Sequence, residues 1–157
     1  MELAKWALLA YRLPREPSTP RIALWRQLRR LGVAQLSDGV VALPLDARTR
    51  EQLEWVADQV TDAGGEASVW LASLASRSQE RALARRMADA IGVEYRALIE
   101  EAAAADRGGG GPGPQAIRRL RRELRRIRAR DYFPQPIARE AQLAVERLGA
   151  TTTEAAS

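Results

Sequence analysis

The sequence predicts an α+β protein, with a ferredoxin-like β-α-β-β-α-β domain over residues 1–75 and a helical extension over residues 76–148. Short apolar runs alternate with amphipathic segments in the first half, and glycine or proline punctuates them. Only helical periodicity follows residue 76. The β-α-β-β-α-β order predicts one four-stranded antiparallel sheet with both helices on the same face.

The first strand is predicted at residues 5–13, because Trp6–Tyr11 form an almost continuous apolar run. A helix then begins at Ser18-Thr19-Pro20, since hydroxyl residues cap helices and proline suits the first helical position. It ends at Gly32, a typical C-terminal cap.

A hairpin follows the first helix. Strands are predicted at residues 33–36 and 40–45, because the intervening residues 37–39 end in the Asp-Gly pair that is typical of tight hairpin turns. The second helix begins directly after this hairpin, and its N-terminal cap is either Asp46 or Thr49.

The second helix ends at Gly64-Gly65, and the fourth strand is predicted at residues 66–74. The tryptophans are distributed over the first and last strands and the two helices. Each lies within an apolar pattern, so we expect them in the core rather than on a stacking surface. They are Trp6, Trp25, Trp55 and Trp70.

The remaining elements of the chain are predicted to be helices. A capping box at Ser76 opens the third helix, and a glycine- and proline-rich flexible linker covers residues 107–114. Further helices are expected at residues 115–130 and 137–148. The tail at 149–157 is expected to be disordered.

Composition excludes several classes of chemistry. The 157 residues contain no cysteine and no histidine, so disulfides, thiolate zinc sites, a cysteine nucleophile and a Ser-His-Asp triad are all ruled out. We expect no catalytic residues, no cofactor and no metal site. No apolar run is long enough to span a membrane, and the apolar start lacks the features of a signal peptide. A cytoplasmic protein that does not contact membranes is therefore expected.

The net charge of +5 is unevenly distributed. Residues 1–30 carry a net charge of +5, residues 31–66 carry −5, and residues 115–130 carry +7 from eight arginines and one glutamate. Segregation of this kind indicates an electric field directed at a polyanion, or at an acidic surface of the protein itself.

The arginine-rich helix at 115–130 is the main candidate for nucleic-acid binding. Its arginines would repel one another unless phosphates or neighbouring carboxylates balance them, and the planar guanidinium suits phosphate well. Glu100, Glu101 and Asp106 could pair with some of them but are too few to balance all eight. The candidate DNA-binding residues are Arg118, Arg119, Arg121, Arg122, Arg125, Arg126, Arg128 and Arg130, together with Arg26, Arg29 and Arg30 of the first helix.

The same helix carries an apolar stripe with a spacing of 3-4-3, which is typical of coiled coils. Antiparallel sheets of this type also leave edge strands unpaired. Both features predict a symmetric homodimer. The stripe consists of Ile117, Leu120, Leu124 and Ile127.

A second basic cluster lies where the first strand ends and the first helix begins. Arg12, Arg15 and Arg21 fall within a short proline-stiffened connection, and free backbone N–H groups at a helix start attract anions. The cluster is a candidate site for a tetrahedral oxyanion. Alternatively, these arginines pair with Glu16 and with the acidic second helix.

Several short strings, in this order, resemble the N-terminal region of the chromate-resistance regulator family (ChrB type) over about residues 5–148. The resemblance implies a non-enzymatic transcriptional regulator that responds to chromate and binds promoter DNA. The strings are WALLAYRLP at 6–14, DGV at 38–40, TREQ at 49–52, GGEA at 64–67 and DYF at 131–133.

The first domain also resembles the ferredoxin-like module of CRISPR adaptation endoribonucleases and of phenylacetate-type repressors. The endoribonuclease pattern has an aspartate near the end of the first strand, where this chain reads Tyr11-Arg12-Leu13. We therefore favour a DNA-binding regulatory module of a chromate-resistance system. The alternatives are an oxyanion sensor that does not contact DNA and a metal-dependent nuclease-like protein.

Overall fold

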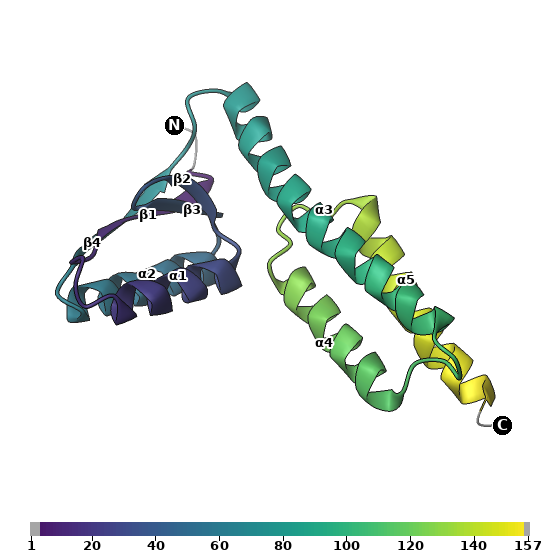
Figure 1. Ribbon diagram of the computed structural model, residues 1–157. Coiled ribbons are helices and arrows are strands. Elements are labelled where there is room, and N and C mark those ends of the chain that lie inside the picture. The colour runs from purple at the N-terminus through teal and green to yellow at the C-terminus, as the bar shows by residue number, and fades with distance from the viewer. Residues whose placement is uncertain (1–3, 156–157) are drawn as a thin grey trace. The chain divides into compact units, whose positions relative to one another are not determined.

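The computed structural model describes residues 4–155 and confirms the α+β fold (Figure 1). Its contacts divide the chain into two units, Met1–Leu83 and Ala84–Ser157, with the division inside the long third helix. In chain order the elements are β1 (Trp6–Arg12), α1 (Thr19–Leu31), β2 (Ala34–Ser37), β3 (Val40–Pro44), α2 (Ala47–Asp62), β4 (Glu66–Ala72), α3 (Arg77–Arg107), α4 (Pro114–Ala129) and α5 (Pro136–Ala155).

The first unit is a single antiparallel sheet with the strand order β2-β3-β1-β4. Helices α1 and α2 lie together on one face of the sheet (Figure 1). Leu9 is paired with Val41 of β3 and with Val69 of β4, so these three side chains share one face. Leu9 and Val41 are fully buried, as are Leu53 and Val56 of α2. The core of this unit therefore lies between the sheet and its two helices.

Local sequence signals explain where several elements begin and end. Gly32 ends α1 with a left-handed φ of 76°. Asp46 caps α2: its carboxylate accepts a hydrogen bond from the Thr49 backbone N–H at 2.7 Å, and the Asp46 N–H donates to the Thr49 hydroxyl at 3.0 Å. Both predicted capping candidates thus act together as a capping box. At the start of α1, however, the Ser18 side chain forms no capping hydrogen bond.

The turn between β2 and β3 requires glycine. Gly39 has a φ of +76°, and a Cβ atom added there would lie 2.5 Å from the backbone oxygen of Tyr11. The Gly39 carbonyl also accepts a hydrogen bond from the Tyr11 N–H at 2.8 Å. The predicted Asp-Gly turn therefore sets the hairpin against β1 as well as reversing the chain.

The expected burial of all four tryptophans is wrong for three of them. Trp6 is 2% exposed, whereas Trp25, Trp55 and Trp70 are 54%, 58% and 59% exposed. The reason is positional, because buried leucine and valine residues occupy the inward stripes of α1 and α2. Trp70 lies on β4, at the edge of the sheet.

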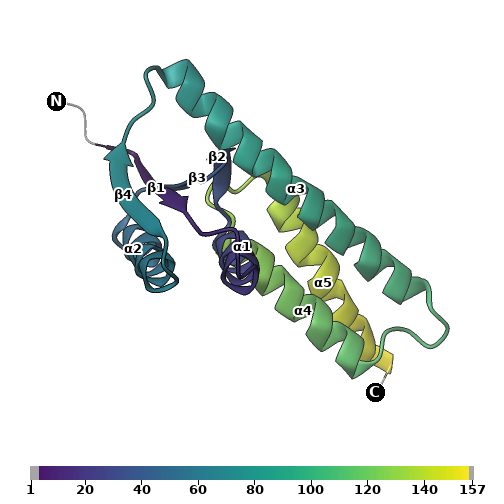
Figure 2. The ribbon, with the colours of Figure 1, turned by 60° about the vertical axis from the view of Figure 1, so that its left-hand side comes forward.

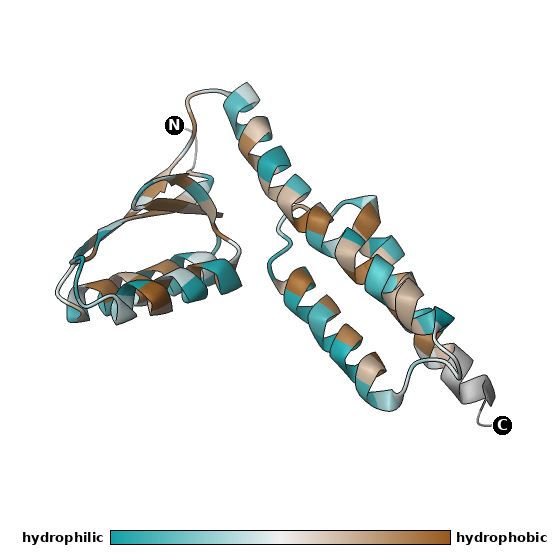
Figure 3. Cartoon of the chain, in the orientation of Figure 1, coloured by the Kyte–Doolittle hydropathy of each residue, from teal (hydrophilic) through white to brown (hydrophobic). Residues whose placement is uncertain are grey.

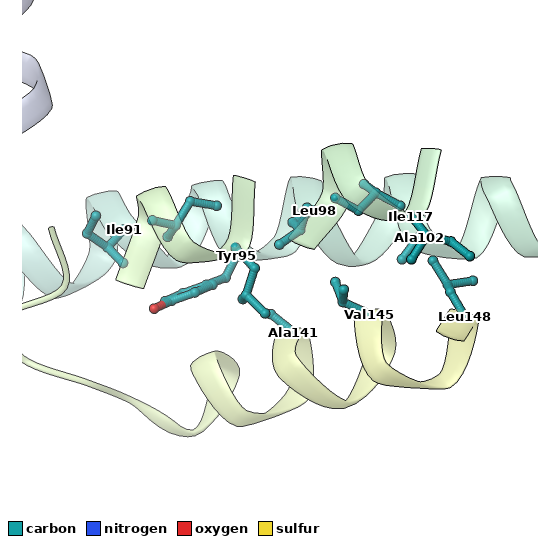
Figure 4. Packing of buried hydrophobic residues seen from close by; sticks show 11 residues of the cluster. Ile91, Tyr95, Leu98, Ala102, Ile117, Ala141, Val145 and Leu148 are labelled. Atoms are coloured by element: carbon teal, nitrogen blue, oxygen red, sulfur yellow. The ribbon is translucent and has the colours of Figure 1, made fainter. Parts of the chain in front are cut away.

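The second unit contains three packed helical segments: most of α3, with α4 and α5 (Figures 1 and 2). Tyr95 of α3 is 1% exposed and belongs to one hydrophobic cluster with residues from α4 and α5 (Figure 4). The cluster consists of Ile91, Tyr95, Leu98, Ala102, Ile117, Leu120, Leu124, Ile127, Ala141, Val145 and Leu148.

The apolar stripe of α4 is therefore covered within the chain. Leu120 and Ile127 are 0% and 1% exposed, and all four stripe residues belong to the internal cluster. The prediction that this stripe pairs with a second copy is wrong, because α3 and α5 supply the apolar surface that it needs.

For the segments around α4 and α5, the sequence-based expectations agree with the structure to different degrees. The expected linker is a loop at residues 108–113, between the ends of α3 and α4. The structure differs at the C-terminus, where we expect disorder over residues 149–157 but α5 continues to Ala155. Gly149 does not end the helix, because the threonine, glutamate and alanine residues after it are compatible with helical backbone. Residues 156 and 157 of the expected tail lie outside the described residues.

Candidate nucleic-acid interface

The arginines of α4 occupy every side of the helix that its apolar stripe leaves free. The stripe repeats at 3-4-3 spacing and faces α3 and α5, so the remaining positions point to solvent or to the flanks of the bundle. Hydrophilic residues consequently alternate with apolar ones along α4 (Figure 3). Seven of its arginines are exposed, and the exception, Arg130, follows the last residue of the helix.

The flank of α4 that faces α3 is neutralised by ion pairs. Arg119 contacts Glu101 at 2.9 Å, and Arg130 contacts Glu94 at 2.6 Å. The Arg130 side chain is only 17% exposed, so its pair is the more shielded of the two. The sequence prediction that Glu101 pairs with this helix is supported. Glu94 was missed, although its seven-residue spacing from Glu101 places both carboxylates on one face of α3.

Five arginines form a row on the rest of the helix surface, which we call the α4 arginine row. None of them forms an ion pair with any side chain that the structure describes, residues 4–150. From the first to the last member the row extends about 15 Å along the helix. Arg126, which is exposed, lies beside it and contacts the partly exposed Glu123 at 3.7 Å. The row consists of Arg118, Arg121, Arg122, Arg125 and Arg128.

Helix α5 borders this row on the side away from α3. The guanidinium of Arg121 lies so close to Gly149 that a Cβ atom added to that glycine would overlap with it. Glycine at this position therefore lets the arginine side chain pass over the surface of α5. At Arg121, the row is thus bordered by α5.

A hydrogen bond joins the end of α4 to the bundle core. The Tyr95 hydroxyl donates to Oδ2 of Asp131 at 2.9 Å, immediately after Arg130. Burial raises the pKa of the Tyr95 phenol, and the hydrogen bond and negative charge of Asp131 raise it further. With the Glu94–Arg130 pair, this contact attaches the C-terminal end of α4 to α3 at two adjacent residues.

The other candidate DNA-binding arginines lie in the first unit, on α1. Arg26, Arg29 and Arg30 are all exposed, as expected. The Arg29 guanidinium lies over the ring of Trp25, 4.8 Å from its centroid, which holds this cation against the helix surface. Arg30 also lines a pocket between α1 and the C-terminal part of α2.

The candidate oxyanion residues are also exposed, and one of them lies opposite a glutamate in the sheet. Arg12 lies opposite Glu66 in the backbone register of β1 and β4. Burial raises the pKa of Tyr11, the positive charge of Arg21 lowers it, and the negative charge of Asp38 raises it, so both charged groups act on this phenol. The convergence of Arg12, Arg15 and Arg21 on one anion remains a prediction.

Two observations bear on the nuclease-like alternative, and a third concerns the character of the helices. Among the described residues, no cluster of three or more His, Cys, Asp or Glu side chains is placed to hold a metal ion. Strand β1 ends at Arg12, without the carboxylate of the endoribonuclease pattern. In the same part of the chain, no helix combines the length and the apolar character that crossing a bilayer requires.

Comparison with known proteins gives an independent assignment. The family described as "Protein ChrB, N-terminal" matches residues 21–106. Protein ChrB of Cupriavidus metallidurans is 32% identical over 143 residues, which cover 88% of this chain and 43% of that protein. The chain thus spans less than half the length of this curated relative. No solved structure matches it. On the family match and this relative, the chain belongs to the ChrB family and corresponds to its N-terminal domain.

Proposed function

We propose that this chain is a non-enzymatic, DNA-binding regulatory module of a chromate-resistance system. Membership of the ChrB family supports the regulatory context. The observation that supports DNA binding is the α4 arginine row. Its five exposed cations have no carboxylate partner among the described residues. A role at chromosomal DNA would place the protein in the cytoplasm.

Phosphate is the partner that this surface fits. Duplex DNA carries about one negative charge per 1.7 Å of its axis, so a row about 15 Å long can meet several phosphates at once. Contacts of this kind position a protein on DNA without reading its sequence. Helix α4 therefore supplies affinity under this proposal, and base recognition requires other groups.

The test is a titration of duplex DNA at several salt concentrations. The row variant replaces Arg118, Arg122 and Arg125 with alanine. Each lost phosphate contact lowers the slope of log K against log salt by about one unit, so we expect a loss of about three units and uniformly weaker binding on all sequences.

A matched control removes the same charge from α3. Arg85, Arg96 and Arg107 are exposed residues of this neighbouring helix, and all three belong to the second unit. Their triple alanine variant has the same net charge as the row variant, and we expect it to retain most of the slope. Equal slopes for the wild type and the row variant would refute phosphate binding by α4. Equal losses in the two variants would show that only total charge matters.

The symmetric homodimer predicted from the sequence is part of this proposal. A two-fold symmetric regulator presents two copies of α4 and suits DNA half-sites that are related by the same symmetry. Since the α4 stripe is buried inside the chain, the dimer must use another surface.

A further inference from the structure

We infer that the free edge of β4 pairs antiparallel with the β4 edge of a second copy, which joins two sheets into one continuous sheet. This inference rests on the dimer in the proposed function and names its surface. It requires neither DNA nor the arginine row.

The two edges of the sheet differ in how they are protected against strand addition. Strand β2 has four residues and a register shift between Gln35 and Ser37, and the Gln35 amide donates to the Ser37 carbonyl oxygen at 3.0 Å. Short length and irregular pairing are the usual protections of an edge strand. The β2 edge is therefore poorly suited to accept another strand.

The β4 edge lacks these protections. It has seven residues, and its pairing with β1 continues in register from one end to the other. It contains no proline, glycine, lysine or arginine, and its single charged side chain is Glu66 at one end. Alternate backbone N–H and C=O groups of an edge strand point away from the sheet, so a long regular edge is a template for another strand.

Exposed apolar side chains lie on both faces of this edge. Trp70 is 59% exposed and shares a face with Leu8, its partner on β1. Leu71 is 44% exposed and shares the opposite face with Ala7, where it lines a pocket beside the start of α2. A strand added at this edge would cover apolar surface above and below the sheet, in addition to completing backbone hydrogen bonds.

A second copy fits this edge because the strand is complementary to itself. Full overlap of two antiparallel β4 strands places Val69 at the two-fold axis. Ser68 then lies opposite Trp70 of the other copy, Ala67 lies opposite Leu71, and Glu66 lies opposite Ala72. The only charged residue therefore faces alanine instead of its own copy. Trp70 already donates from Nε1 to the Ser68 hydroxyl at 2.8 Å within one strand, so the opposed pair combines groups that can hydrogen-bond.

The first test measures the mass in solution by light scattering over a range of concentrations. We expect the wild-type mass to approach twice the 17.4 kDa of one chain. In the Ser68→Lys/Trp70→Lys variant the new cations lie opposite each other, so we expect complete loss of the dimer. The control Trp55→Lys changes a tryptophan of similar exposure on α2 and should remain dimeric. A wild-type chain that stays monomeric throughout would overturn the inference.

Mixing oppositely charged variants separates pairing from damage to the fold. The Ser68→Glu/Trp70→Glu variant should also be monomeric alone, and an equimolar mixture with the Ser68→Lys/Trp70→Lys variant should recover the doubled mass. A mixture that stays monomeric while the wild type is dimeric would overturn the assigned register. The salt slope for DNA is measured separately, so a failure of this edge is distinguishable from a failure of DNA binding.

Discussion

Replacing Tyr95 by phenylalanine should weaken the three-helix unit by an amount that the structure allows us to estimate. The change removes only the hydroxyl, whose hydrogen bond to Asp131 is 2.9 Å long, and the ring keeps its place in the cluster. Hydrogen bonds to charged groups contribute about 1.5–3 kcal/mol. Because Asp131 is partly exposed, water can solvate the carboxylate that loses its donor. We therefore expect the lower end of this range, about 1.5 kcal/mol.

The placement of tryptophan provides the assay. All four tryptophans belong to the first unit, so their fluorescence reports on the unfolding of that unit. Far-ultraviolet circular dichroism is dominated by helix and also reports on the second unit. In urea unfolding, Tyr95→Phe should shift the midpoint of the circular dichroism transition to a lower urea concentration. The midpoint of the fluorescence transition should stay unchanged. In a double-mutant cycle, Asp131→Asn should cost less in the Tyr95→Phe background than in the wild type.

The same substitution should also change the dependence of stability on pH. The pKa of Tyr95 is raised in the folded chain, so above pH about 10 the unfolded chain loses the phenol proton while the folded chain retains it. The stabilisation by Tyr95 is complete below that pH and is lost as the pH rises toward the folded pKa. The difference in unfolding free energy between wild type and Tyr95→Phe should therefore shrink as the pH rises above about 10. Coincident dichroism transitions of the wild type and Tyr95→Phe at neutral pH, or a difference that stays constant above pH about 10, would refute this reasoning.

Two further substitutions probe the charged surfaces. Glu101→Gln removes the carboxylate that Arg119 contacts, so it should tighten DNA binding and steepen the salt slope by about one unit; weaker binding would argue against α4 as the phosphate-contacting element. Arg21→Ala should abolish weak, salt-sensitive binding of chromate, for which sulfate competes, as measured by isothermal titration at low salt. Identical chromate heats in wild type and Arg21→Ala would favour the interpretation that these arginines only neutralise nearby carboxylates.

Much of the fold could be predicted because its signals are local. Apolar runs, the Asp-Gly turn and the glycine at the end of α1 each act within a few residues, and together they predict the order of the sheet elements. The burial of single large residues could not be predicted in this way. A tryptophan in an apolar pattern is buried only if it lies on the stripe that faces the sheet, and Trp25 and Trp55 lie off that stripe.

By itself, the sequence determined the α+β fold, the family and the concentration of arginine on α4. Periodicity and composition depend only on the order of residues, and the sequence contains them in full. Only the tertiary structure decided which of these arginines carry unbalanced charge, because Glu94 and Glu101 reach α4 through the packing of α3 against it. It also decided that the α4 stripe is internal and that β4 is an edge. Both facts depend on which segments lie side by side, and that is decided by contacts between residues far apart in the chain.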